Sequence, residues 1–293
     1  MSGLYDIYNG LYRPGELKRI AGHLQAELGR TVETIKKKPA LYYLSYLYRN
    51  QRTESISAVL GAISKHHTTA RRTVFCDVRV GSYSYDNVTS GGLFDNSEKA
   101  ESNDYLVMPA ELEADAFRFA LWKLTDARYR EALEQFYQKK SRAVHYIDEN
   151  RALKSRLRQP TFQNLQAGRL PEIDPDEIKQ RMRRLSAVVR GHAEIKNSVL
   201  RFRTNHQQKI FCSAEGRMIL EQRALFELNA QVWVLTSSGT GISQELNFME
   251  ADPAALPSEK DLHRLLRERM ALLKRLMQTR PLNSYSGPVL LSP

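Results

Sequence analysis

Strict alternation of apolar and polar residues constrains the fold of this chain more than any other feature. The clearest case alternates Val74, Cys76, Val78 and Val80 with Thr73, Asp77 and Arg79. Because successive side chains of a β-strand point to opposite faces, this pattern predicts a strand with one buried and one wetter face. Two more strand-like runs, at 41–48 and 56–62, lie only a few residues away. Such short gaps favour an antiparallel meander over parallel crossovers.

Helical spacing brackets this β-rich region on both sides. Apolar residues three, four and seven apart predict a helix from Leu17 to Ile35, ended by the lysines and the proline of 36–39. A loop rich in Ser, Asn, Asp and Gly is expected at 81–104. A second helix is predicted at 114–144, and its inward residues are expected to be Phe117, Leu121, Leu124, Leu133 and Phe136.

The second half of the sequence repeats the alternation of helix and strand. After a polar connection at 151–170, Asp174 precedes Pro175 and can cap the free amides of a helix, with Glu177 closing the capping box. Strand-like runs follow at 199–204, 208–213 and 217–235, with turns expected at 205–206, 215–216 and 237–241. Ser258 then opens a last helix, which Pro281 ends.

This order predicts an α+β fold, in which antiparallel or mixed sheets pack with helices in two sheet-plus-helix halves. The halves are expected at 1–150 and 151–293, the second ending in a strand. No stretch approaches the roughly 18 apolar residues of a membrane span. The start of the sequence has no secretion signal, and two cysteines are too few for a disulfide framework. We therefore expect a cytoplasmic protein that does not contact a membrane.

Positive charge gathers in one part of the sequence. Between residues 151 and 210 there are 14 Lys or Arg and 5 Asp or Glu, which supplies +9 of the net +11. A basic surface of this kind could track phosphates, so a nucleic-acid-binding module is one hypothesis. The alternative is a solvated helix face with a flexible connection, and the scarcity of aromatic residues in this region favours it.

Residue patterns for catalysis are nearly missing, so we predict no catalytic and no metal-binding residue. None of the seven histidines is followed by Glu. His66, His67 and His206 are interpreted as polar turn residues rather than metal ligands. Cys76 and Cys212 fall on the apolar sides of alternating strands, where a thiol is usually an inert hydrophobic group. The Ser-Ser-Gly-Thr-Gly turn lacks the lysine of a phosphate-binding loop.

Four stretches nevertheless form a recognisable series along the sequence. They are Val-Arg-Val-Gly at 78–81 followed by Asp86 and Asn87, Ala-Leu-Trp-Lys-Leu-Thr-Asp at 120–126, Phe-Cys-Ser-Ala-Glu-Gly at 211–216, and Tyr-Ser-Gly-Pro-Val-Leu-Leu at 285–291. In order and spacing they resemble the TldD/PmbA family, and the likeness covers residues 15–293. Members of that family look like cytoplasmic zinc metallopeptidases, once described as modulators of DNA gyrase.

The resemblance implies a scaffold rather than a catalytic centre. The family's zinc is held by a His-Glu-x-x-x-His helix and a downstream cysteine, and this sequence contains no such helix. We therefore expect no cofactor in this span, with zinc only in a longer protein. The chain would be the amino-terminal, substrate-cavity region of a peptidase that acts on unfolded peptides. A non-catalytic regulatory paralogue of such a peptidase is the alternative that the resemblance leaves open.

The expected partners are an unfolded peptide and a second subunit, which is either another copy of the chain or a paralogue. An extended peptide binds well by adding a strand to an open sheet edge, because backbone amides supply affinity whatever the sequence. The candidate edge residues are Val78, Arg79 and Val80, and the candidate loop residues are Asp86 and Asn87.

Overall fold

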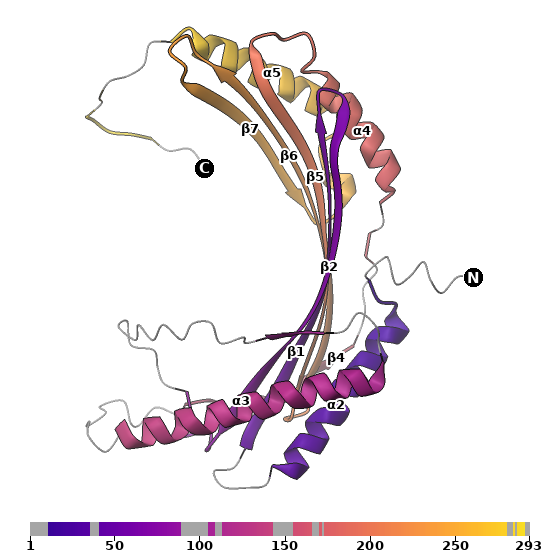
Figure 1. Ribbon diagram of the computed structural model, residues 1–293, viewed down its shortest axis with the longest axis vertical. Coiled ribbons are helices and arrows are strands. Elements are labelled where there is room, and N and C mark those ends of the chain that lie inside the picture. The colour runs from indigo at the N-terminus through magenta and orange to yellow at the C-terminus, as the bar shows by residue number, and fades with distance from the viewer. Residues whose placement is uncertain are drawn as a thin grey trace. The chain divides into compact units, whose positions relative to one another are not determined.

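A computed structural model describes residues 11–35, 41–88, 105–108, 113–142, 155–165, 170–171, 173–279, 284 and 286–290. The helix-ending signal at 36–39, most of the expected loop at 81–104 and Pro281 lie outside the described residues. The structure confirms the α+β class: helices pack on a seven-stranded sheet (Figure 1). Val289 and Leu290 are exposed and belong to no strand, although a strand was expected there.

All strands of the described residues join one sheet. Its strands are β1 (Leu41–Val59), β2 (Ala62–Val80), β3 (Tyr105–Val107), β4 (Gln163–Asn164), β5 (Ile195–Ser213), β6 (Met218–Leu235) and β7 (Gly241–Glu250). They are ordered β3-β2-β1-β5-β6-β4, and β7 also pairs with β6. The pairs β2–β3 and β6–β7 are antiparallel, whereas the short β4 runs parallel to β6. No strand was expected at the position of β7, after the turn at 237–241.

The long strands are fewer and longer than predicted. The runs at 41–48 and 56–62 are mostly one strand, β1, and the runs at 199–204 and 208–213 are one strand, β5. Burial in β5 alternates without a break through Thr204, His206 and Gln208. Those buried positions are polar, so a search for apolar alternation reads them as a turn.

Turn assignments for the histidines are therefore wrong. His66 and His67 lie within β2, and His206 is a buried residue of β5. The real turn between β1 and β2 is Leu60–Gly61, and both residues have positive φ, 47° and 80°. A two-residue turn of this type matches the twist of an antiparallel hairpin. The Gly61 amide donates to Ser186 Oγ and Arg190 Nε donates to the Leu60 carbonyl, so the rare conformation of Leu60 is held from outside.

The chain divides into two compact units. Unit 1 comprises Met1–Thr53, Thr69–Leu170 and Asn205–Ala224, and unit 2 comprises Glu54–Thr68, Pro171–Thr204 and Leu225–Pro293. Unit 1 carries α2 (Pro14–Thr34) and α3 (Ala114–Arg142), which pack against each other. Both helices agree with the predicted ones. Of the expected inward residues of α3, Phe117, Leu121 and Leu124 are buried, and Leu133 and Phe136 pack against the same core.

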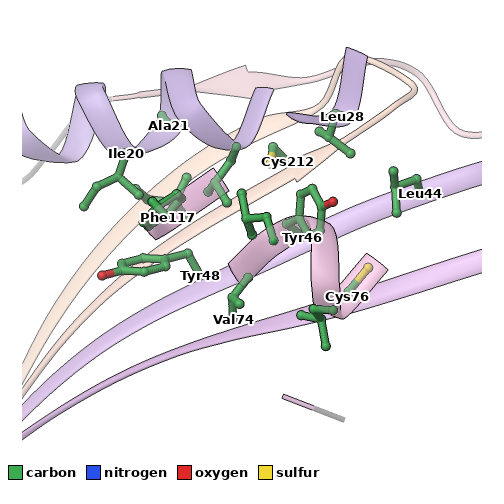
Figure 2. Close-up of a cluster of buried hydrophobic side chains, with 14 of the residues drawn as sticks. Ile20, Ala21, Leu28, Leu44, Tyr46, Tyr48, Val74, Cys76, Phe117 and Cys212 are labelled. Carbon is green, nitrogen blue, oxygen red and sulfur yellow. The ribbon is translucent and has the colours of Figure 1, made fainter. Parts of the chain in front are cut away.

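The core of unit 1 lies between these helices and one face of the sheet (Figure 2). Even-numbered residues of the strands supply it, among them Leu44, Tyr46, Val74, Cys76 and Cys212. The odd-numbered residues of the same strand segments point to the opposite face. The alternation that predicts β2 thus also determines which of its side chains stay available for binding.

Unit 2 carries α4 (Pro175–Ala187) and α5 (Glu259–Met277), which contact each other, and α5 also lies along β7 (Figure 1). Both helices begin where the sequence predicts. Asp174 accepts a hydrogen bond from the Asp176 amide at 2.9 Å, and Ser258 Oγ accepts one from the Asp261 amide at 3.2 Å. These caps satisfy amides that the first turn leaves unpaired.

Candidate binding cleft

Unit 1 contains an open cleft of about 630 Å³ that follows the outer part of β2. This volume is within the range of small-molecule and peptide sites. Five consecutive residues of β2, Phe75 to Arg79, line it. Its other lining residues are Tyr43, Ser45, Leu47, Asn87, Val88, Arg128, Glu131, Ala132, Gln135, Arg156, Phe211 and Arg217. Side chains on both faces of β2 therefore contribute, and on the face away from the helices the lining continues across β1 to Phe211 of β5.

Hydrogen bonding shows which backbone groups of β2 face outward. The Met108 amide donates to the Arg72 carbonyl at 2.9 Å, and Val74 pairs with Leu106 in the β2–β3 register. In an antiparallel pair, residues that bond to one neighbour alternate with residues that bond to the other. The even-numbered residues between Arg72 and Val80 therefore direct their N–H and C=O groups away from β1.

This outer edge has no strand partner beyond Phe75 among the described residues. The Val80 amide donates to Asn87 Oδ1 at 3.0 Å, so a side chain occupies the last outward donor. Between these two points lie the outward backbone groups of Cys76 and Val78, and no strand of the described residues pairs with them. They are a short row of donors and acceptors that face the cleft.

On the face away from the helices, a charged group forms one wall of the cleft. Arg79 Nε lies 2.6 Å from one carboxylate oxygen of Asp77, and Arg156 Nη1 lies 3.5 Å from the other. The guanidinium of Arg156 also covers the ring of Tyr43, with Cζ 3.5 Å from the ring centroid. Cation–π contact and ion pair together hold Arg156 over the sheet.

Polar side chains of α3 form the opposite wall. Arg128 Nη1 lies 2.6 Å from Glu131 Oε2, and Gln135 Nε2 donates to Glu131 Oε1 at 3.2 Å. Asn87 Nδ2 donates to Gln135 Oε1 at 3.0 Å. Asn87 therefore connects the end of β2 to the helix through both ends of its amide.

Asp86 lies under this end of the cleft and is fully buried. Its carboxylate accepts hydrogen bonds from the Tyr42 hydroxyl at 2.8 Å and from the Val88 amide at 2.9 Å. Arg79 Nη1 is 3.6 Å away and Lys139 Nζ is 3.9 Å away. Burial, and then the hydrogen bond to Asp86, raise the pKa of Tyr42, so this hydroxyl stays a donor.

The structure brings the sequence-predicted residues together in two roles. Val78, Arg79 and Asn87 line the cleft. Val80 and Asp86 are fully buried and support it from below. Sequence reasoning missed Arg156 and the polar group on α3. Arg128, Glu131 and Gln135 stand three and four residues apart and so mark one helix face, whereas nothing around Arg156 signals its position.

Metal ligands do not gather in the part of the chain that the structure describes: no group of three or more His, Cys, Asp or Glu could hold a metal ion there. His66 Nε2 lies 2.8 Å from Glu54 Oε1, which is one acid and not a ligand set. No helix among the described residues is long and apolar enough to cross a membrane.

Several cations of the basic region at 151–210 serve contacts within unit 2. Arg184 Nε lies 2.8 Å from Glu259 Oε1, and Arg203 Nη1 lies 3.3 Å from Glu227 Oε2. Arg181 and Arg190 donate to backbone carbonyls of Pro257 and Leu60. These contacts agree with a structural role for the charges, and nucleic-acid binding by this region stays a hypothesis.

Both thiols should be unreactive in the folded protein, as the sequence suggests. Burial raises the pKa of Cys76 and of Cys212 from 9.0 to about 12. We expect Ellman's reagent at pH 8 to label both only as fast as the chain unfolds, because the thiolate is scarce and enclosed. Ser238→Cys, at an exposed turn, is the control and should react at once. Rapid labelling of the native wild-type chain would contradict this prediction.

The same shifts give a pH dependence with a definite sign. The unfolded thiols ionise above about pH 9, whereas the folded ones stay neutral to about pH 12. The stability that these buried thiols contribute is therefore complete below pH 9 and is lost as the pH rises toward 12.

Solved structures that share this fold include proteins from two bacteria. A protein described as a candidate modulator of DNA gyrase from Bacteroides thetaiotaomicron aligns with a TM-score of 0.54 and 9% identity, over 91% of this chain and 51% of its own. A similarly described protein from Thermotoga maritima aligns with a TM-score of 0.50 and 14% identity, over 85% of this chain and 49% of its own. TldE from Thermococcus kodakarensis aligns with a TM-score of 0.47 and 13% identity, over 85% of this chain and 47% of its own.

The chain therefore has the fold found in the candidate gyrase-modulator proteins, and spans about half the length of the chains it matches. The TldD/PmbA resemblance that the sequence suggests is confirmed as a likeness of fold. Neither a protein-family model nor a curated protein matches the sequence.

Proposed function

We propose that the cleft binds an extended stretch of polypeptide, which adds as a further strand to the outer edge of β2. The observation that carries this proposal is the pair of outward-facing residues, Cys76 and Val78, whose backbone groups border a cleft of about 630 Å³. A strand that pairs there would make the backbone hydrogen bonds of a sheet, which do not depend on the sequence of the guest.

Within a TldD/PmbA-like peptidase, this chain would then form the part that receives unfolded substrate. Zinc does not fit the described residues, because they contain no group of three ligands. No step of hydrolysis is therefore assigned to this chain. By the resemblance, zinc and hydrolysis belong to a part that carries His-Glu-x-x-x-His. The expected homodimer, or heterodimer with a paralogue, and a cytoplasmic location belong to the same proposal.

Hydrogen exchange of single amides tests strand addition directly. In the free protein we expect the outward amides of Cys76 and Val78 to exchange quickly. A bound peptide should slow both by at least about tenfold, because each becomes a ladder donor. Asp77 and Arg79, whose amides face β1, are internal controls and should not change. Equal protection of all four amides in the free protein would show that the edge is already paired, and would overturn the proposal.

The peptide can be altered without any change to the protein, and the strand can be altered at Val78, whose side chain is buried, so circular dichroism must first show that both Val78 variants are folded. Methylation of every backbone nitrogen of the peptide should abolish binding. Methylation of alternate nitrogens blocks only one edge of the extended peptide, so binding through the other edge should be retained. Val78→Pro removes the outward donor and should weaken binding about tenfold. Proline is tolerated where an edge N–H faces solvent. Val78→Thr keeps the donor and should bind within about threefold of wild type. Binding that survives complete methylation would contradict strand addition.

A further inference from the structure

We propose that Arg49 and Arg71 form a carboxylate pocket that receives the C-terminal carboxylate of the bound peptide. This inference rests on the proposed function, because it defines the end and the direction of the added strand. The pocket has a volume of about 190 Å³ and is lined by Arg49, Gln51, Arg71, Thr73, Phe75 and Tyr105. Phe75 also lines the cleft, so the two hollows adjoin.

All six lining residues are odd-numbered and lie on the face of the sheet away from α2 and α3. Two guanidinium groups cover two aromatic rings there. Arg49 Cζ lies 5.3 Å from the centroid of Phe75, and Arg71 Cζ lies 4.8 Å from that of Tyr105. The two rings are 5.4 Å apart. This stacking holds both guanidinium groups against the aromatic rings of one pocket.

The charge of this pocket is not balanced within the described residues. No acidic residue lines it, and neither Arg49 nor Arg71 makes an ion pair in the described part of the chain. Arg49 Nε is buried and has no hydrogen-bond partner there. A buried donor left unpaired is costly, and two cations that line one pocket repel each other. An anion in the pocket would offset the charge of both guanidinium groups.

A carboxylate fits these donors. Guanidinium groups bind planar two-oxygen anions through paired N–H donors. Thr73 and Tyr105 add hydroxyl groups and Gln51 adds an amide to the same lining. The aromatic rings already carry guanidinium groups on their faces, which leaves little stacking surface for nucleic-acid bases.

The position of the pocket identifies which carboxylate it would receive. β3 pairs with Thr73, Val74 and Phe75, so an added strand must stop at Cys76. A strand antiparallel to β2 runs from Val80 toward Cys76 and brings its C-terminus against Tyr105. A parallel strand would bring its ammonium group to the same two arginines. Electrostatics therefore selects the antiparallel direction and a free C-terminus at this end.

Three peptides of one sequence test this assignment. The first has a free C-terminus, the second a C-terminal amide, and the third a C-terminal amide after an added Glu. The free acid should bind wild type about tenfold more tightly than the amide, and the Glu amide should bind like the plain amide. Added salt should weaken binding of the free acid most. If the Glu amide binds as tightly as the free acid, the pocket takes a side-chain carboxylate and the assignment to the terminus is wrong.

Arginine variants locate the effect. Arg49→Gln and Arg71→Gln should each reduce the preference for the free acid to within about threefold, while the affinity for the amide hardly changes. Arg130→Gln removes an exposed cation of α3 that pairs with Asp126, and should leave the preference intact. Arg49→Lys keeps the charge without the paired donors and should give an intermediate preference.

The outcomes separate this inference from the proposed function. If acid and amide bind wild type equally, while the amide-exchange and methylation tests still report strand addition, the carboxylate pocket is overturned and the proposed function stands. If the acid is preferred but a fully N-methylated acid binds equally well, strand addition fails together with the assigned direction, and only the binding of a terminal carboxylate by the pocket is supported. If no peptide binds at all, the proposed function fails and this inference fails with it.

Discussion

Replacing Asp86 by alanine should lower the free energy of unfolding by about 3–5 kcal/mol. The carboxylate is fully buried, accepts two hydrogen bonds, and lies within 4 Å of Arg79 and Lys139. Its removal leaves the Tyr42 hydroxyl and the Val88 amide without this acceptor, and two cations without this counter-charge. Breaking a buried ion pair from one side costs much more than the pair itself contributes.

Urea unfolding followed by circular dichroism measures the loss. Asp86→Asn keeps an oxygen acceptor for Tyr42 and removes the charge, so it should lose less stability than Asp86→Ala. Asp126→Ala is the matched control, because its exposed pair with Arg130 spans 3.0 Å on the surface of α3. It should cost less than about 0.5 kcal/mol. Equal losses for Asp86→Ala and Asp126→Ala would show that the buried carboxylate is not stabilising.

Local patterns in the sequence predict most of the helices and strands. The elements that they predict wrongly share one cause, which is dependence on residues far away in the chain. The helices carry caps and apolar residues at helical spacing, and both signals depend on residues close in sequence. Long strands do not depend on such residues alone. Gln208 continues the buried face of β5 because it bonds to Asn50 and to the backbone at Tyr12. Those partners are about 160 and 200 residues away in the chain, so the local sequence at 205–208 resembles a turn.

The part of the candidate site that depends on residues close in sequence was predictable. Alternation in β2 identifies Val78 as buried and Arg79 as available, and the resemblance adds Asp86 and Asn87. The remaining features of the site depend on the register in which β3 pairs with β2. Only the pairing of β3 with residues 73–75 shows where the part of the edge that lacks a partner strand among the described residues begins. Arg156 lies in a connection and Arg49 lies in β1. Residue spacing does not show which strands or loops lie beside them, so neither arginine stands out in the sequence.

Phe117→Ala should cost about 3–5 kcal/mol of stability, whereas Phe119→Ala, two residues along the same helix, should change it by less than about 0.5 kcal/mol. Phe117 is 2% exposed, and its ring lies 5.9 Å from that of Tyr48 (Figure 2). The same ring lies 5.8 Å from that of His23. Phe119 is 63% exposed and its ring contact is with Trp122, itself 48% exposed. The two variants remove the same atoms, so helix propensity cancels and only burial differs. Unfolding in urea compares them, and similar losses would show that α3 does not pack on the sheet through Phe117.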